Sequence, residues 1–335
     1  MAAQVQSVLG GLDPQQLGRT LMHEHLVIGY SGWEADTLHP GPSRREMIKV
    51  CVDRVEELKA GGVETMLDPC PSDLGRDVEL AAEVAQKTGF QLICATGLYK
   101  EAEGGTAYWK FRSTFGSQVE AMAEIFIHEI SEGIGDTGIR AGIIKVATGH
   151  GAITDYERGV LEAAAKASVA TGAPITTHTD DGKLGDEQQA ILTAHGVPPH
   201  RIIIGHSCGT DNHDYHMKIA AAGSYLGFDR FGLDMIQPDD SRVAALVKVV
   251  QAGAGAQVVV SHDTVWCWRG QPLTDPAMIA TVAPNWQPLH FLRNIVPRLR
   301  EAGLADDQIE MMTVDNPRRF FAGEALPESL PGRHR

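Results

Sequence analysis

The sequence predicts an α/β protein of the (β/α)8 TIM barrel class. Eight short runs rich in Val, Ile and Leu, bounded by turn residues, alternate regularly with segments of helical length. Strands that are apolar almost throughout are typical of a parallel sheet covered by helices. An open, doubly wound sheet is the alternative, but no Gly-x-Gly-x-x-Gly motif follows a predicted strand. The chain length suits a closed barrel of eight units.

The eight predicted strands are, in chain order, 20–27, 65–68, 91–96, 141–146, 174–178, 201–206, 224–229 and 257–261. Three helices should begin at capping boxes, in which a Ser or Thr precedes a Glu by three residues: Ser43 with Glu46, Ser117 with Glu120, and Thr154 with Glu157. Apolar periodicity and glycine stops predict further helices at 77–88, 186–195, 212–222, 240–252 and 286–302.

Composition favours one enzyme-sized domain over residues 1–335, with a core of about 17–321 and a tail at 322–335, of which 331–335 should be disordered. No linker or short repeat interrupts the chain. The net charge of −14 argues against nucleic-acid and membrane-surface partners. With no secretory signal and no apolar run of spanning length, the expected compartment is the cytoplasm. The 5 cysteines form no Cys-x-x-Cys pair, so we expect reduced and mostly buried thiols.

Polar side chains stand where the predicted strands end, and active sites of this fold gather at that face. His23 and His25 are two residues apart on the first strand, so both should project from one side of it. Later strands end in further residues that can bind metals or carry charge: Lys145, His178, His206 and Asp263. A single histidine at a strand end is more often structural than a ligand. The convergence of several such residues on one face favours a metal site.

Lys145 lies inside an apolar strand, where an unpaired ammonium group is costly. The residue could react with carbon dioxide to give a carbamate that bridges two cations. It could also form a Schiff base, or an ion pair with Asp68 or Asp263. Four other histidines are not predicted to be ligands. We expect His213 and His216 on a solvated helix face, His262 directed away from the site, and His150 in a loop.

Taken together, these residues resemble the binuclear centre of the amidohydrolase superfamily. The chain is similar to the phosphotriesterase family over residues 17–321, on the motifs Leu21-Met22-His23-Glu24-His25-Leu26, Lys145-Val146-Ala147-Thr148, Thr177-His178-Thr179 and Gly205-His206-Ser207. Within that family it most resembles the phosphotriesterase-like lactonases, on Gly97-Leu98-Tyr99, Thr210-Asp211-Asn212 and Asp229-Arg230-Phe231-Gly232-Leu233-Asp234.

The resemblance implies an amidohydrolase-like barrel that holds two divalent metal ions, with zinc as the first choice and cobalt, manganese or iron as alternatives. His23, His25 and Asp263 would hold the more buried ion, and His178 and His206 the more exposed one. A carbamylated Lys145 and a hydroxide would bridge the two ions, and the hydroxide would attack the substrate.

By the same resemblance, Asp263 would also transfer the proton, Tyr99 would lie beside the hydroxide and Arg230 would line the substrate pocket. From the residues alone, Tyr99 would be an interfacial aromatic, and Arg230 an ion-pair partner of Asp229 or Asp234.

Three features depart from the lactonase pattern. Thr264 follows Asp263 where an aromatic residue is common, and Ser207-Cys208-Gly209 lacks an acidic residue at its third position. Residues 265–285, with Trp266 and Trp268, are expected to form the loop after the eighth strand. Residues 316–321 resemble the family's closing segment and should form a helix packed across the barrel.

The expected function is a metal-dependent hydrolase that opens acyl-homoserine lactones or oxo-lactones, with promiscuous organophosphate triesterase activity. The alternatives are a dedicated aryldialkylphosphatase, a carboxylesterase or amidohydrolase with the same centre, and a ligand-binding barrel without catalysis. The partners would be a small lactone or organophosphate and, by resemblance, a second copy of the chain in a homodimer.

Overall fold

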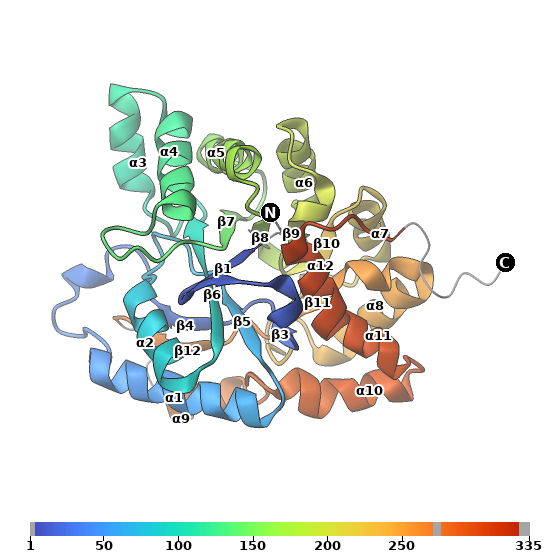
Figure 1. The fold of residues 1–335 in the computed structure, drawn as a ribbon. Helices are drawn as coiled ribbons and strands as arrows, with labels where there is room; N and C mark the ends of the chain where they lie inside the picture. Colours follow the sequence, from blue (N-terminus) through green and yellow to red (C-terminus); the bar gives the residue numbers. More distant parts are fainter. Residues whose placement is uncertain (1–3, 271–275, 328–335) are drawn as a thin grey trace.

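The computed structural model describes residues 4–270 and 276–327, and it contains an eight-stranded parallel sheet surrounded by helices (Figure 1). The strand order is β3-β5-β6-β7-β8-β9-β10-β11. Their bounds are Thr20–Leu21, Thr65–Asp68, Gln91–Gly97, Ile143–Thr148, Ile175–Thr179, Ile202–Ile204, Tyr225–Phe228 and Val258–Val260. Neighbouring strands follow one another along the chain, as in a barrel, except that the short strand β4 (His25–Ile28) comes between β3 and β5 and belongs to another sheet.

The two edges of this sheet meet at Met22, whose N–H donates to the carbonyl oxygen of Val260 at 3.4 Å. The sheet is therefore a nearly closed barrel, and the predicted TIM barrel class is confirmed. Every predicted strand has a counterpart, although the first is divided. β3 ends at Leu21, and the chain resumes as β4 (His25–Ile28), so His23 lies between two strands rather than inside one.

The helices confirm most of the predicted segments. Ser43 and Thr154 form complete capping boxes, and the side chain of Ser117 caps its helix alone. The bounds are α1 Arg44–Ala60, α2 Val78–Thr88, α3 Thr106–Arg112, α4 Gln118–Ser131, α5 Asp155–Thr171, α6 Gly185–Ala194, α7 His213–Ala221, α8 Asp239–Val249, α9 Pro276–Val282, α10 Val296–Glu301, α11 Asp306–Glu310 and α12 Asn316–Ala322.

The prediction that residues 265–285 form a loop is wrong in two places. Val265–Trp268 forms strand β12, which pairs in parallel with β4, and helix α9 follows later in the segment. The β-branched and aromatic residues of Val265-Trp266-Cys267-Trp268 favour an extended strand, and β4 offers it a free edge. An N-terminal hairpin, β1 (Val5–Ser7) with β2 (Gly10–Leu12), and the helix α3 were also not predicted.

Helix α12 packs across the amino-terminal end of the barrel, as predicted. The ring of Phe320 lies 5.3 Å from that of Tyr225, the first residue of β10, and both side chains are fully buried. The predicted disorder of residues 331–335 falls outside the described residues. All 5 cysteines are buried free thiols, in agreement with the prediction. Within the described ranges, no helix has both the length and the apolar character needed to cross a bilayer.

Candidate metal centre

Four histidine rings meet at the carboxyl ends of the strands. The centroid of the His23 ring lies 5.2 Å from that of His25 and 4.7 Å from that of His206, and the His178 ring lies 4.6 Å from His206. All four side chains are buried. The structure thus brings together four histidines from three strand units, the divided first strand (β3 and β4), β8 and β9, as the sequence predicts.

The carboxylate of Asp263 lies at the centre of this group. Its Oδ1 is 3.4 Å from Nε2 of His23 and 3.2 Å from Nε2 of His25, and its Oδ2 is 3.8 Å from Nε2 of His206. One ligand atom each from His23, His25 and Asp263 fall within 4.8 Å of one another, close enough to surround a cation. Imidazole nitrogens and a carboxylate oxygen are ligands that suit divalent transition metals.

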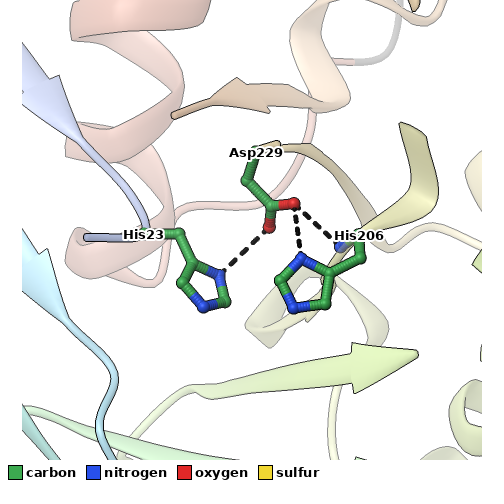
Figure 2. A group of neighbouring side chains, drawn as sticks. All are labelled: His23, His206 and Asp229. Carbon is green, nitrogen blue, oxygen red and sulfur yellow. Dashed lines mark hydrogen bonds and ion pairs between the residues drawn. The ribbon is translucent and has the colours of Figure 1, made fainter. Parts of the chain in front are cut away.

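A second set of carboxylates lies behind the rings and fixes their orientation. Asp229 contacts Nδ1 of His23 at 3.2 Å and Nδ1 of His206 at 2.9 Å (Figure 2). Asp68 contacts Nδ1 of His25 at 3.0 Å. Because a carboxylate accepts hydrogen bonds, each Nδ1 carries a proton. In the neutral rings of His23 and His206, the lone pair is therefore on Nε2 and faces Asp263.

His178 is oriented the opposite way. Its Nε2 lies 2.7 Å from Oδ1 of Asp180, and its Nδ1 lies 3.3 Å from the hydroxyl of Tyr99. Lys100 holds Asp180 with its Nζ at 3.0 Å from both carboxylate oxygens. The lone pair that His178 directs into the site is therefore on Nδ1. Burial lowers the pKa of His178 to about 3, which keeps this ring neutral.

Burial also lowers the pKa of His23 and holds that of His206 well below its usual range. His25 differs, because its hydrogen bonds with Asp263 and Asp68 outweigh burial and raise its pKa well above 6.5. These two hydrogen bonds favour a second proton on the His25 ring, at the Nε2 that lies 3.2 Å from Asp263. A metal ion at this position would replace that proton.

Lys145 is 2% exposed and has no carboxylate partner in the described part of the chain. Its Nζ lies 3.2 Å from Nε2 of His23 and donates to the carbonyl oxygen of Thr177 at 3.2 Å. Burial lowers its pKa to about 8, so a reactive neutral amine is accessible near physiological pH. The alternative of an ion pair between Lys145 and Asp68 or Asp263 is wrong. Asp68 contacts His25, and Asp263 contacts the histidines and Arg230.

Arg230 and Tyr99 both reach the centre. The Nε of Arg230 donates to Oδ2 of Asp263 at 2.8 Å, so the alternative partners Asp229 and Asp234 are wrong. Burial raises the pKa of Tyr99 well above 10, which leaves its phenol protonated and able to donate. Burial alone would raise the pKa of Asp263, but its neighbours His23, His206 and Arg230 hold it well below its usual range.

A cavity of about 210 Å³ opens over these residues. Polar groups of the centre form its floor, and its walls are largely apolar. The wall residues come from the end of β4, from the loops after β5 and β10, and from the segment after β11 that includes β12 and α9. They include Ile28, Leu74, Leu233, Met235, Ile236, Val265, Trp268, Ile279 and Trp286. An apolar chamber above a few convergent polar groups is typical of a small-molecule site.

The sequence does not predict the orienting role of three residues, Asp68, Asp180 and Asp229. It indicates Asp68 only as a possible partner of Lys145 and Asp229 only as a possible partner of Arg230, and it assigns no role to Asp180. The spacing of Asp180, two residues after His178, could have indicated it, since i and i+2 share a face of a strand.

Among the other histidines, His262 is directed away from the site, as predicted. His150 lies in the loop after β7, exposed near Asp180 and Asp181. The solvated face predicted for His216 is wrong, because its ring is fully buried and contacts the carbonyl oxygen of Ser207 at 2.8 Å.

The barrel and the side chains at its centre define an amidohydrolase-like, metal-dependent hydrolase. The model of the phosphotriesterase family matches residues 3–321. A phosphotriesterase homology protein of Mycobacterium tuberculosis is 37% identical over 316 residues, 93% of this chain and 95% of that protein. An aryldialkylphosphatase of Saccharolobus solfataricus is 34% identical over an alignment that covers 93% of this chain and 97% of that protein.

A solved structure is also similar. The structure of a mutant PTE-like lactonase from Deinococcus radiodurans matches with a TM-score of 0.90 and 38% identity, over 95% of this chain and 99% of that one. The chain belongs to the phosphotriesterase family.

Proposed function

We propose that this protein is a binuclear metal-dependent hydrolase that opens lactones of the acyl-homoserine or oxo-lactone type, with a weaker activity on organophosphate triesters. The observation that carries the proposal is the meeting of three Nε2 atoms at the carboxylate of Asp263, on the floor of an apolar cavity. The polar ring of a lactone would contact the polar residues at the floor of this cavity. The apolar chain of an acylated lactone would pack against its apolar walls.

The donor set fits two divalent cations. His23, His25 and Asp263 would hold one, since their ligand atoms already lie within 4.8 Å of one another. His178 through Nδ1 and His206 through Nε2 would hold the other, because the opposite nitrogen of each ring faces a carboxylate. Lys145, as a carbamate, would supply an oxygen to both. This mixture of imidazole and carboxylate ligands suits zinc first and also cobalt, manganese or iron.

When bound, the two cations would polarise the substrate's carbonyl or phosphoryl oxygen and lower the pKa of a bound water. The chain's own groups would do the rest. Asp263 would take the proton of the attacking water and deliver it to the leaving alkoxide, with Arg230 holding its Oδ2. Tyr99, a neutral phenol beside His178, would donate to the oxygen on which negative charge develops. The apolar walls would hold the acyl chain and exclude water.

The resemblance to the phosphotriesterase-like lactonases and the apolar cavity support the lactone substrate. The aryldialkylphosphatase relative supports the second activity, because tetrahedral and pentacoordinate transition states both place charge at the same point. A dedicated phosphotriesterase, a carboxylesterase or amidohydrolase, and a barrel without catalysis are the competing assignments. The family resemblance also leads us to propose a homodimer, which light scattering of the purified protein would test.

A panel of substrates tests this proposal. Metal-replete protein is assayed with γ- and δ-lactones of several chain lengths, acyl-homoserine lactones, aryl phosphotriesters, aryl esters and N-acyl amino acids. We expect kcat/KM to be highest for lactones with an apolar chain and lower, but measurable, for phosphotriesters. A preference for phosphotriesters, esters or amides would replace the proposal with the corresponding alternative, and inactivity on the whole panel would refute catalysis.

A further inference from the structure

Glu24 stands between the two histidines of the first strand, yet its carboxylate faces away from them and is fully buried. Oε1 accepts hydrogen bonds from the hydroxyl of Ser261 at 2.8 Å, from the N–H of His262 at 2.9 Å and from Nδ1 of His262 at 2.6 Å. Oε2 accepts from the N–H of Thr264 at 3.0 Å and also from its hydroxyl. A single side chain therefore receives five hydrogen bonds, a complete set for a carboxylate.

All five donors flank Asp263 on its two sides. Asp263 itself has a φ of 56°, a left-handed conformation that is strained for residues other than glycine. Such a conformation persists when the surrounding contacts fix it. Here the contacts that fix Asp263 are made by Glu24, which accepts hydrogen bonds from His262, the residue before Asp263, and from Thr264, the residue after it.

The same hydrogen bonds tie Asp263 to the histidines. The hydroxyl of Ser261 donates to Glu24 and accepts from the N–H of His23 at 3.0 Å. The N–H of Asp263 donates to the carbonyl oxygen of His23 at 2.9 Å, and the N–H of His25 donates to that of Thr264 at 2.8 Å. Glu24 is thus the central acceptor of a hydrogen-bond network that joins residues 23–25 to residues 261–264. The side chains of His23, His25 and Asp263 lie on the other side of this network, toward the centre of the barrel.

The far side of the segment is fixed as well. Nε2 of His262 accepts from the N–H of Phe291 at 2.9 Å, so Nδ1 of His262 carries the proton that Glu24 receives. The indole of Trp286 donates to the carbonyl oxygens of His262 and Asp263, at 3.0 and 3.2 Å. The Asp263 side chain takes no part in these hydrogen bonds, and its carboxylate is directed toward the imidazoles of His23 and His25.

From this arrangement we propose that Glu24 is a positioning residue for Asp263. It sets the distance between the Asp263 carboxylate and the Nε2 atoms of His23 and His25 without touching the substrate or a metal ion. The inference rests on the ligand and proton-transfer roles proposed for Asp263. It explains why an acidic residue stands between two histidines whose own orienting carboxylates are Asp68 and Asp229.

Glu24→Gln tests the inference because the amide has the same shape but replaces one acceptor oxygen by a donor. Either the Ser261 and His262 donors or the Thr264 donors then face an NH2 group. Glu129→Gln is the matched control, since Glu129 is also a buried glutamate, held by Arg76 at 2.7 Å and remote from residues 261–264. We expect both variants to lower Tm.

The two variants should differ in three further measurements. For Glu24→Gln we expect a roughly tenfold or greater loss of zinc affinity by chelator competition, as changes behind metal ligands produce. We also expect a lower kcat at an unchanged KM, and a crystal structure in which the Asp263 carboxylate has moved away from His23 and His25. Glu129→Gln should match the wild type in all three. Equal zinc affinity, equal kcat and an unmoved Asp263 in folded Glu24→Gln would overturn the inference.

Thr264→Val and Thr264→Ser form a second pair in case Glu24→Gln does not fold. Valine removes the hydroxyl donor to Glu24 at nearly constant volume, whereas serine keeps it. Valine should reduce zinc affinity and kcat in the same direction, and serine should not; equal behaviour of the two would contradict the proposal. If the wild type bound no metal and hydrolysed nothing, the proposed function would fail. The position of Asp263 in the two variant crystal structures would still decide the role of Glu24.

Discussion

The single carboxylate of Asp229 contacts Nδ1 of both His23 and His206, at 3.2 and 2.9 Å. It also accepts the backbone N–H of His206 at 2.9 Å. One buried side chain from the end of β10 therefore sets the tautomer of two rings that come from strand units on either side of β10. In the proposed centre these rings belong to different cations, so Asp229 couples the two halves of the site.

Asp229→Asn should weaken metal binding at this centre. The amide keeps one acceptor oxygen, so one of the two rings loses its partner and the tautomer that directs its Nε2 lone pair inward. We expect zinc affinity to fall about 10- to 100-fold. Chelator competition followed by elemental analysis measures this loss. Asp186→Asn is the control, since Asp186 pairs with Lys218 at the surface, and it should bind zinc as the wild type does. Unchanged metal binding in Asp229→Asn would rule out the orienting role.

Lys145→Ala should lose most of the bound metal and activity, because it removes the side chain proposed to bridge the cations. A short carboxylic acid such as propionate, added to the variant, should restore part of the activity by supplying the missing oxygens. Elemental analysis and lactone turnover with and without propionate make the measurement. If the variant retained its full metal content, Lys145 would not be a bridging carbamate.

Asp239 anchors the loop that carries Arg230 and Leu233, by accepting the N–H of Gly232 at 3.0 Å. Burial opposes its charge, but the hydrogen bond from His290 at 2.7 Å, that from Gly232 and the charge of Arg242 lower its pKa below 3.8. A lowered folded-state pKa stabilises the fold above the unfolded pKa, and this stabilisation is lost as the pH falls toward the folded value.

Asp239→Asn should therefore lower Tm at pH 7, and the difference from the wild type should shrink as the pH falls below about 4. Thermal unfolding followed by circular dichroism between pH 3 and 8 measures it. The neighbouring Asp240, whose side chain is 92% exposed, gives the control Asp240→Asn, for which we expect no difference. A Tm difference independent of pH would show that the Asp239 charge does not stabilise the fold.

The apolar wall of the cavity should determine the preferred chain length. Ile236→Asn places an amide on that wall, so KM for a long-chain lactone should rise roughly tenfold, which corresponds to about 1.4 kcal/mol. KM for an unsubstituted γ-lactone should not change. Leu38→Asn is the same kind of substitution at an exposed leucine that does not line this cavity, and it should alter neither value. Equal effects on long and short lactones would place the acyl chain elsewhere.

The sequence predicted the barrel because apolar periodicity and capping residues are local signals, as Ser43 and Thr154 illustrate. It predicted which chemical groups meet, because parallel strands place their carboxyl ends together. It did not predict the partners of those groups. Asp229, Asp68 and Glu24 act through contacts between residues from 23 to 240 positions apart, which periodicity does not encode. Strand β12 was missed for the same reason, because its pairing with β4 joins the two ends of the barrel.

The proposed activity requires two cations to act together in this site. Metal-free protein titrated with zinc, with lactone turnover recorded at each addition, tests it directly. We expect activity to rise until two equivalents of zinc per chain are bound and then to stay constant. Full activity at one equivalent, or turnover that does not depend on zinc or on any other divalent metal, would contradict it.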